Sequence, residues 1–329
     1  MKNFCHILNE IKAYLQPQLQ QVESVIEDAL RSDVSLLDAT NRSLRDNPGK
    51  MMRPSLALLC AAAVGTPNQD TIKFAAAAEL LHNATLLHDD VVDCAQQRRG
   101  RPTVASFLNP HASVLIGDFW LVKAVKTILE ASCNTGRVTR IFAATLGHLA
   151  QGELLQMEKA VKGDTTQQDY ERIIYCKTAS LFEASALSAA ISVNAPQEYV
   201  KAMGEFARLL GMAFQVKDDW MDYAAGEPAL GKPVGIDLKE QKITQPLLSA
   251  LEGAENEADI RDKVVRIADS PELCREVLEF VKSRGGVEKS ALKVDHFIEM
   301  AIGQLDFLPE GPARNRLVTI ARYVGERGK

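Results

Sequence analysis

Two short clusters of aspartates are the most chemically suggestive feature of the sequence. Each has the pattern Asp-Asp-X-X-Asp, first in DDVVD and again in DDWMD, and the six acids are Asp89, Asp90, Asp93, Asp218, Asp219 and Asp222. At about 100° of rotation per residue, the three carboxylates of a cluster fall within one arc of an α-helix. The two intervening residues fall on the opposite arc, so each cluster predicts a helical turn with a carboxylate front and an apolar back.

Such a turn is costly without a counter-charge, because neighbouring carboxylates repel each other and weaken the helix. Divalent cations between the carboxylates would relieve the repulsion. Oxygen ligands with open coordination positions suit Mg²⁺, which keeps waters and takes substrate phosphates as further ligands. The alternative is a solvated acidic surface, which two copies in hydrophobic helices disfavour. Two such helices facing each other would form a pocket with a metal-rich mouth and an apolar interior.

Basic residues gather near predicted helix boundaries. Lys50 and Arg53 lie at the start of a helix, where the macrodipole repels cations, so an anion bound between them would explain their presence. Arg98, Arg99 and Arg101 follow the first cluster, and arginine binds phosphate in a bidentate geometry. Ordinary surface positions, or salt bridges from Arg98 and Arg99 to the acidic turn, are the alternatives. Weaker basic candidates are Lys177, Lys232, Lys239 and Lys242.

Helices must position these residues, because helical periodicity runs through most of the chain. Apolar residues recur at three- and four-residue steps over 8–30, which predicts an amphipathic helix. Similar patterns predict helices over 52–65, 71–95, 113–132, 137–160, 177–192, 198–224, 257–268, 271–283, 287–306 and 311–325. No run alternates like a strand, and the least regular stretch, 225–241, predicts a loop. The sequence therefore predicts an all-α fold of ten or more helices.

Composition narrows the function class. The chain has 329 residues, 46% of them hydrophobic, which excludes a disordered, collagen-like or rod-shaped protein. A net charge of −5 without a basic tail disfavours nucleic-acid binding. The six cysteines are scattered and form no C-x-x-C pair, which indicates a reducing compartment. With neither a signal-peptide pattern nor a membrane-spanning stretch, we expect a cytoplasmic protein without integral membrane association.

Several motifs, in this order and spacing, resemble the trans-polyprenyl diphosphate synthase family, also called polyprenyl synthetases. They are PGKMMRP, LLHDDVVD, RRGRPT, GD at 117–118, KT at 177–178, GMAFQVKDDWMDY and GKPVGIDLKEQKITQPLL. The resemblance spans most of the chain and is to medium- and long-chain members of the octaprenyl and solanesyl type. It implies one polyprenyl synthetase domain over 1–329, with the isoprenoid synthase type I fold: a single large orthogonal helical bundle around a deep central cavity.

The resemblance also implies an activity and its requirements. The reaction would be Mg²⁺-dependent head-to-tail condensation of isopentenyl diphosphate with an allylic diphosphate, usually in a homodimer. Several Mg²⁺ ions and basic side chains would stabilise the leaving diphosphate, and a dry pocket would protect the allylic cation from water. The released diphosphate would take up the proton. No Ser-His-Asp or Cys-His nucleophile would then be needed.

Residue roles follow from the same resemblance. The six aspartates would bind magnesium. The isopentenyl diphosphate site would contain Lys50, Arg53, His82 and Arg99. The allylic diphosphate would contact Arg98, Lys177 and Lys232. Polar groups near the reacting carbon would be Thr178 and Gln215, and residues supporting the site or forming a lid would be Asp237 and Lys242. The catalytic set would be Asp89, Asp90, Asp93, Lys177, Thr178, Gln215 and Asp218.

Product length depends, in this family, on the size of the side chains just before the first aspartate cluster. Here these residues are Ala84 and Thr85, which are small. We therefore expect a medium- to long-chain product such as a quinone side-chain precursor; the alternative is a short-chain farnesyl or geranylgeranyl diphosphate synthase. Lys217 departs from the family pattern, and its place on the helical wheel predicts that it points away from the carboxylates.

Other classes of protein fit the sequence less well. A head-to-head squalene or phytoene synthase would lack the GKMMRP and GKPVGID elements. A terpene cyclase would usually lack the second complete aspartate cluster, and a regulatory subunit of a heteromeric synthase would tend to lose such clusters. A magnesium-binding scaffold would not need the paired basic residues.

Overall fold

The computed structural model describes residues 4–45, 49–98, 100–224, 235–267 and 270–327. Most of this part of the chain is helical, and the strands found in it form one short antiparallel pair, β1 (Gln97–Arg98) and β2 (Arg101–Pro102). The predicted all-α fold is confirmed. The helices up to residue 162 are α1 (Phe4–Tyr14), α2 (Gln16–Leu30), α3 (Ser35–Arg45), α4 (Met52–Val64), α5 (Gln69–Val92), α6 (Val104–Phe107), α7 (Pro110–Leu129) and α8 (Thr135–Lys162).

The remaining helical elements begin with a pair that is joined by a π-helical turn, η1. They are α9 (Gln167–Ile174), η1 (Tyr175–Ala179), α10 (Ser180–Ser192), α11 (Gln197–Ala224), α12 (Ile236–Lys239), α13 (Gln245–Leu251), α14 (Glu257–Val265), α15 (Pro271–Ser283), α16 (Gly286–Gly303) and α17 (Pro312–Glu326). Single π-helical turns are uncommon and occur frequently at functional sites.

The helix predicted over 8–30 is in fact two helices, α1 and α2. Pro17 stands in the first turn of α2, where the missing N–H costs nothing, but it could not continue an existing helix. The short helices α3, α6, α9, α12 and α13 were not predicted, because segments of a few turns carry little periodicity. Within the predicted loop, 225–234 lie outside the described residues, and α12 occupies part of the remainder.

The chain forms two compact units. Unit 1 consists of Met1–Ala143, Ala184–Met203 and Leu308–Leu317; unit 2 consists of Ala144–Glu183, Gly204–Phe307 and Val318–Lys329. The first aspartate cluster therefore belongs to unit 1 and the second to unit 2. A single domain over 1–329 stays a prediction.

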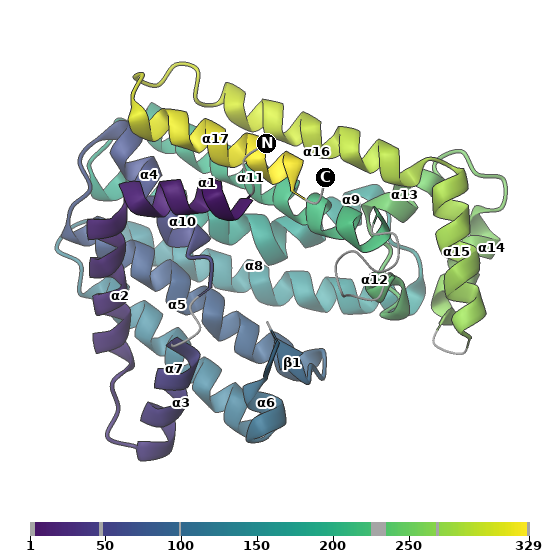
Figure 1. Cartoon of the computed structure of the whole chain (residues 1–329), viewed down its shortest axis with the longest axis horizontal. Coiled ribbons are helices and arrows are strands. Elements are labelled where there is room, and N and C mark those ends of the chain that lie inside the picture. The colour runs from purple at the N-terminus through teal and green to yellow at the C-terminus, as the bar shows by residue number, and fades with distance from the viewer. Residues whose placement is uncertain (1–3, 46–48, 99, 225–234, 268–269, 328–329) are drawn as a thin grey trace. The chain divides into compact units, whose positions relative to one another are not determined.

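In unit 1, α5 packs against α2, α4 and α7, and α6 lies against both α5 and α7 (Figure 1). The side chains of residues 75–78, all alanine, are completely buried, and such small side chains let neighbouring helices approach closely. Asn68 and Thr71 form a reciprocal capping box that fixes where α5 begins. The start of α5 and its buried middle thus set the position of the aspartates at its other end.

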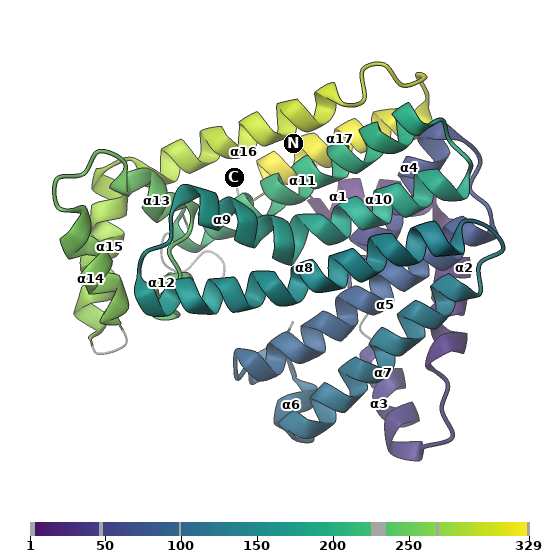
Figure 2. The same ribbon diagram turned by 180° about the vertical axis from the view of Figure 1, so that it is seen from behind.

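In unit 2, α13 packs against α15 and α16, and α14 lies beside α15 (Figure 2). A close approach joins α11 to the π-helical turn, because a Cβ built on Gly211 would lie 2.6 Å from the Cα of Ala179. The glycine therefore allows side chains of α11 to reach those of η1. Among the residues that the structure describes, no helix is long and apolar enough to cross a membrane.

Candidate active site

Both aspartate clusters lie at the carboxyl ends of long helices. Asp89 and Asp90 are in the last turn of α5, and Asp93 is its C-cap residue. The second cluster lies in the last two turns of α11, which ends at Ala224. The helix macrodipole is negative at this end, so it disfavours carboxylates and favours cations. The placement adds to the mutual repulsion of the acids and increases the need for positive charge.

In the first cluster, Asp90 is the most buried acid, at 4% exposed, and it forms an ion pair with Arg98. The Nε of Arg98 donates to Oδ1 of Asp90 at 2.7 Å. The β1–β2 hairpin carries Arg98, and its turn contains Gly100 with φ of +75°, a conformation that favours glycine. Asp89 is half-buried and Asp93 is exposed. One of the alternatives from the sequence, that Arg98 pairs with the acidic turn, is what the structure contains.

The apolar residues of the first cluster are not buried in unit 1. Val92 is 51% exposed and Val91 is half-buried, whereas Asp90 in the same turn is only 4% exposed. In the second cluster, Trp220 is half-buried, and the ammonium group of a buried lysine lies over its ring. Lys217 is 1% exposed, and its Nζ lies 3.5 Å from the centroid of the Trp220 ring. Lys217 therefore contacts the side of α11 that the wheel places opposite the carboxylates.

The second cluster is tied into a buried hydrogen-bond chain. The hydroxyl of Tyr170 donates to Oδ2 of Asp219 at 2.6 Å, and the Nε2 of Gln215 donates to Oδ1 at 2.9 Å. The hydroxyl of Thr178 donates to Oε1 of Gln215 at 2.6 Å. Thr178 and Gln215 were expected to lie together near the reaction, and the structure places them in direct contact.

Burial leaves two acids of this region with strongly raised pKa values. The pKa of Asp219 is raised to about 6, first by desolvation and then by repulsion from Asp218 and Asp222, against the hydrogen bonds from Tyr170 and Gln215. The pKa of Asp237 is raised to about 8 by desolvation and by repulsion from Asp219 and Asp222, although Lys242 opposes the shift. The positive charge near Asp219 and Asp237 therefore does not balance the negative charge of the carboxylates around them.

The other two acids of the second cluster have different partners. Asp222 accepts hydrogen bonds from the backbone N–H groups of Ile236 and Asp237, at 3.1 and 3.0 Å, and so holds α12 in place. Asp218 forms an ion pair with Arg327, whose guanidinium also lies over the Phe214 ring, 4.1 Å from its centroid. The three carboxylates of the cluster thus point to three different sets of donors.

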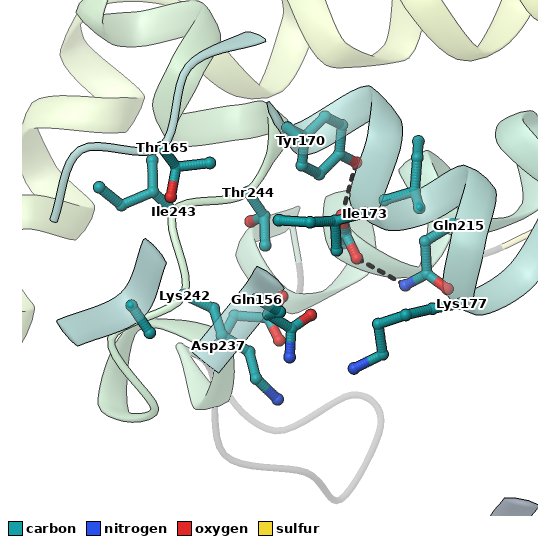
Figure 3. Close-up of a pocket in the computed structure, with 13 residues that line it drawn as sticks. Gln156, Thr165, Tyr170, Ile173, Lys177, Gln215, Asp237, Lys242, Ile243 and Thr244 are labelled. Carbon is teal, nitrogen blue, oxygen red and sulfur yellow. Dashed lines mark hydrogen bonds between the residues drawn. The ribbon is translucent and has the colours of Figure 1, made fainter. Parts of the chain in front are cut away.

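A small pocket of about 120 Å³ lies beside Asp219. Figure 3 shows Lys177, Gln215, Asp237 and Lys242 among the residues that line it, so four predicted site residues gather here. The Nζ of Lys177 lies 2.5 Å from a carboxylate oxygen of Glu153. The pocket combines ammonium groups with carboxylates and is suited to an anion that brings its own cations.

In unit 1, the described residues predicted to bind isopentenyl diphosphate lie on two helices or just before one of them. Lys50 is exposed just before α4, and Arg53 is half-buried in its first turn. Between them, Met51 has a φ of +53°, which is uncommon for a residue other than glycine. Desolvation lowers the pKa of Arg53 to about 10, against the opposing effect of Glu79. His82 is half-buried on α5.

The predicted product-length residues are on α5 as well. Ala84 is 1% exposed, whereas Thr85 is half-buried and its hydroxyl donates to the backbone oxygen of His82 at 2.8 Å. Two further predicted residues, Arg99 and Lys232, lie outside the described residues.

The carboxylates fit Mg²⁺ by their chemistry but do not form a closed cage. Within the described ranges, no group of three or more histidine, cysteine, aspartate or glutamate side chains is arranged to hold a metal ion. Magnesium in proteins is commonly bound by one or two carboxylates, with waters and substrate phosphates completing its shell. The raised pKa of Asp219 and the helix-end positions both favour a cation, so the donor set fits an ion that a substrate helps to bind.

Sequence reasoning missed three residues of this region: Tyr170, Glu153 and Arg327. A tyrosine in an apolar helix is usually a core residue, and nothing in its spacing links Tyr170 to Asp219. Glu153 and Arg327 reach their partners across long sequence separations, 24 and 109 residues. Lys177 and Asp218 were predicted without ion-pair partners. Only the three-dimensional structure identifies Glu153 and Arg327 as those partners.

An all-α fold with two aspartate-rich helix ends and neighbouring basic residues defines the class: a helical enzyme that acts on a polyanionic substrate. Residues 34–281 match the sequence profile of the polyprenyl synthetase family. The chain is 35% identical to the octaprenyl diphosphate synthase of Escherichia coli (strain K12) over 323 residues, 98% of this chain and 99% of the relative. The chain belongs to the polyprenyl synthetase family.

Solved structures agree with this assignment. A decaprenyl diphosphate synthase from Rhodobacter capsulatus has a TM-score of 0.90 and 32% identity, covering 98% of this chain and 99% of that chain. A geranylgeranyl pyrophosphate synthetase from Pyrococcus horikoshii Ot3 has a TM-score of 0.88 and 30% identity, covering 97% and 99%. The chain therefore has the all-α isoprenoid synthase fold.

Proposed function

We propose that this protein is a trans-prenyltransferase that condenses isopentenyl diphosphate head-to-tail with an allylic diphosphate. The observation that carries the proposal within the site is the buried chain from Thr178 through Gln215 to Asp219, beside Lys177. The carboxylate of Asp219, the amide of Gln215 and the ammonium group of Lys177 line one pocket, and the hydroxyl of Thr178 holds the amide. These groups suit an anionic leaving group better than they suit a covalent nucleophile mechanism.

The aspartates of both clusters are proposed to bind Mg²⁺ together with the substrate diphosphates. Bound Mg²⁺ would supply electrostatic stabilisation of the departing diphosphate. The contribution of the chain is to hold Asp219 with Tyr170 and Gln215, so that its carboxylate is oriented before the substrate arrives. The hydrogen bond from Arg98 holds Asp90 in place. It would thereby fix the end of α5 and the positions of Asp89 and Asp93.

The basic residues are proposed to bind the two diphosphates. Arg98, Lys177 and Lys232 are assigned to the allylic diphosphate. For isopentenyl diphosphate, the assigned residues are Lys50, Arg53, His82 and Arg99. The half-buried position of Arg53 supports its assignment, because a partly desolvated guanidinium binds an anion more strongly than a solvated one. Since each unit carries one aspartate cluster, we propose that the whole chain acts as one domain.

The product is a medium- to long-chain polyprenyl diphosphate, which would suit quinone side chains. Small residues at positions 84 and 85 support this length, and the relatives include octaprenyl and decaprenyl diphosphate synthases. A short-chain product is the second candidate, because the geranylgeranyl pyrophosphate synthetase from Pyrococcus horikoshii Ot3 is almost as similar in structure.

A homodimer is proposed from one face of α7. Leu115, Val122 and Leu129 recur at seven-residue spacing and are 69%, 63% and 58% exposed. A seven-residue repeat places side chains on one stripe of a helix, and an exposed apolar stripe is the usual seam of helix–helix association. A second copy of this chain would cover it.

A cytoplasmic location is proposed as well.

The decisive experiment incubates the purified full-length protein with isopentenyl diphosphate, Mg²⁺ and allylic primers of several lengths. Chromatography of the products should show chains extended by several isoprene units, and the longest product distinguishes the two candidates. Asp89→Ala and Asp218→Ala should remove most of the activity while the protein stays folded by circular dichroism. Absence of elongation with every primer would refute the enzyme assignment.

A further inference from the structure

A larger pocket lies in unit 1, separate from the one beside Asp219. Its volume is about 590 Å³, within the range of roughly 300–1,000 Å³ typical of small-molecule sites. Its lining comes from α3, α5, α6, α7 and the β1–β2 hairpin, elements that lie together in both ribbon views (Figures 1 and 2). Most of the lining is apolar and includes Leu44, Leu86, Leu87 and Trp120.

Helix α3 covers this pocket loosely. Among its residues, only Asn41 is buried. The Nε1 of Trp120 donates to Oδ1 of Asn41 at 2.8 Å, and the Nδ2 of Asn41 donates to the backbone oxygen of Leu30 at the same distance. Asn41 thus anchors the middle of the helix and an ion pair from Arg45 to Glu27 its end, while Leu36 at its start lines the pocket and is 59% exposed.

A second exposed apolar residue stands at the end of α6. Phe107 is 76% exposed and also lines the pocket. Large side chains left this exposed around one cavity indicate a binding surface, because burying them against an apolar ligand is favourable. The ligand should therefore have an apolar body of substantial length.

The charged groups in the lining indicate that the ligand has an anionic end. They are Asp90, Arg98 and Arg101, so the described lining carries one net positive charge. Arg98 is paired with Asp90, whereas Arg101 is exposed on β2. Thr40, Ser43 and Asn83 add polar groups to an otherwise apolar wall. An apolar cavity with a guanidinium at its rim is complementary to a single-chain anionic amphiphile.

We propose that this pocket is a second isoprenoid site, which binds the tail of a prenyl diphosphate with the diphosphate at Arg101. The choice of an isoprenoid over another amphiphile rests on the proposed function, because the enzyme would itself make such molecules. The site differs from the predicted product tunnel. At about 100° per residue, Asn83 and Thr85 lie about 160° apart around α5, and only Asn83 lines this pocket.

The pocket contains its own fluorescent probe. The sequence has two tryptophans, so Trp220→Phe leaves Trp120 in the pocket as the single emitter. The full-length variant is titrated with farnesyl diphosphate in EDTA, which suppresses magnesium-dependent binding at the aspartates. The expected result is a saturable change in Trp120 emission.

Leu36→Glu and Phe107→Glu, each in that background, should weaken binding by roughly tenfold or more. Both side chains are exposed, so the fold should tolerate the changes. Leu292→Glu, at a position 69% exposed on α16, is the matched control and should bind as the parent does. Arg101→Ala should weaken binding of farnesyl diphosphate but leave binding of farnesol unchanged.

Several outcomes would overturn the proposal. Unchanged binding in both glutamate variants would place the ligand elsewhere, and loss of the signal with Thr85→Phe alone would place it in the predicted tunnel. Equal affinity for myristate would remove the isoprenoid assignment. A change of oligomeric state in Leu36→Glu, measured by light scattering, would make the pocket a subunit contact. Failure of the condensation assay would refute the proposed function but leave the binding result standing, so the two can fail separately.

Discussion

The hydrogen bond from Tyr170 to Asp219 offers a direct test of how this site is organised. Tyr170 is 2% exposed, and its hydroxyl lies 2.6 Å from Oδ2 of Asp219. Tyr170→Phe keeps the ring and removes only the hydroxyl, so the surrounding packing should change little. What is lost is one donor to a buried carboxylate, and the ionised form of that carboxylate should become less stable.

The size of the effect can be worked from the structure. A hydrogen bond to a charged group contributes about 1.5–3 kcal/mol. Each pKa unit corresponds to about 1.36 kcal/mol, so the loss is worth roughly one to two units. The pKa of Asp219 is already raised to about 6, and in the variant it should lie between roughly 7 and 8. At pH 7 the ionised fraction would fall roughly two- to tenfold.

In the proposed metal role, Mg²⁺ would bind the ionised carboxylate of Asp219, so the Mg²⁺ affinity should fall by a similar factor at pH 7 and recover as the pH rises. Calorimetric titration of the full-length protein at pH 6.5, 7 and 9 would measure this, since Asp219 is ionised in both proteins at pH 9. Tyr175→Phe is the matched control, because it also removes a hydroxyl that donates to a carboxylate, that of Glu183 at 3.0 Å. A deficit of equal size at every pH, or an equal loss in the control, would refute the reasoning.

Three further predictions concern stability and product length. The folded-state pKa of Asp237 is raised from 3.8 to about 8, so the folded chain holds this proton more tightly than the unfolded chain and loses stability as the pH rises from 4 to 8. Asp237→Asn should flatten that slope in urea unfolding with EDTA, and an unchanged slope would contradict it. Arg327→Gln should lower the free energy of unfolding by about 1 kcal/mol, measured in the same way, because it removes the partly exposed ion pair to Asp218. Thr85→Phe should shorten the products on chromatography; Ala84→Phe, at a 1% exposed position, should also cost roughly 1–3 kcal/mol of stability by overpacking.

The long helices could be predicted because apolar and small residues run on over many turns without a turn signal. Helix α5 buries every residue from Phe74 to Leu81 and then Ala84, Leu87 and Asp90 at three-residue steps, so the pattern exceeds the noise of single positions. The break at Pro17 and the π-helical turn at Tyr175–Ala179 could not be read in this way, since both are local departures from regular geometry. Boundaries depend on such details of single residues.

For the site, the sequence predicts residue types better than their partners. The spacing of the aspartates places them on one arc of a helix, but it does not determine that Asp90 is buried against Arg98 while Asp93 is exposed. That difference arises from the β1–β2 hairpin, which depends on the left-handed backbone of Gly100. Tertiary contacts therefore divide carboxylates that are equivalent in the sequence into groups with different electrostatic surroundings.

These surroundings indicate where the demand for added positive charge is greatest. Asp90 and Asp218 each have an arginine partner, whereas the contacts described for Asp219 and Asp222 come from neutral donors. Burial raises the pKa values of Asp219 and Asp237, and repulsion among Asp219, Asp222 and Asp237 near the negative end of α11 raises them further. A divalent cation should therefore relieve more repulsion at the second cluster than at the first. If so, Mg²⁺ without substrate should stabilise the wild-type protein at pH 8, and Asp219→Asn should remove more of that stabilisation than Asp90→Asn.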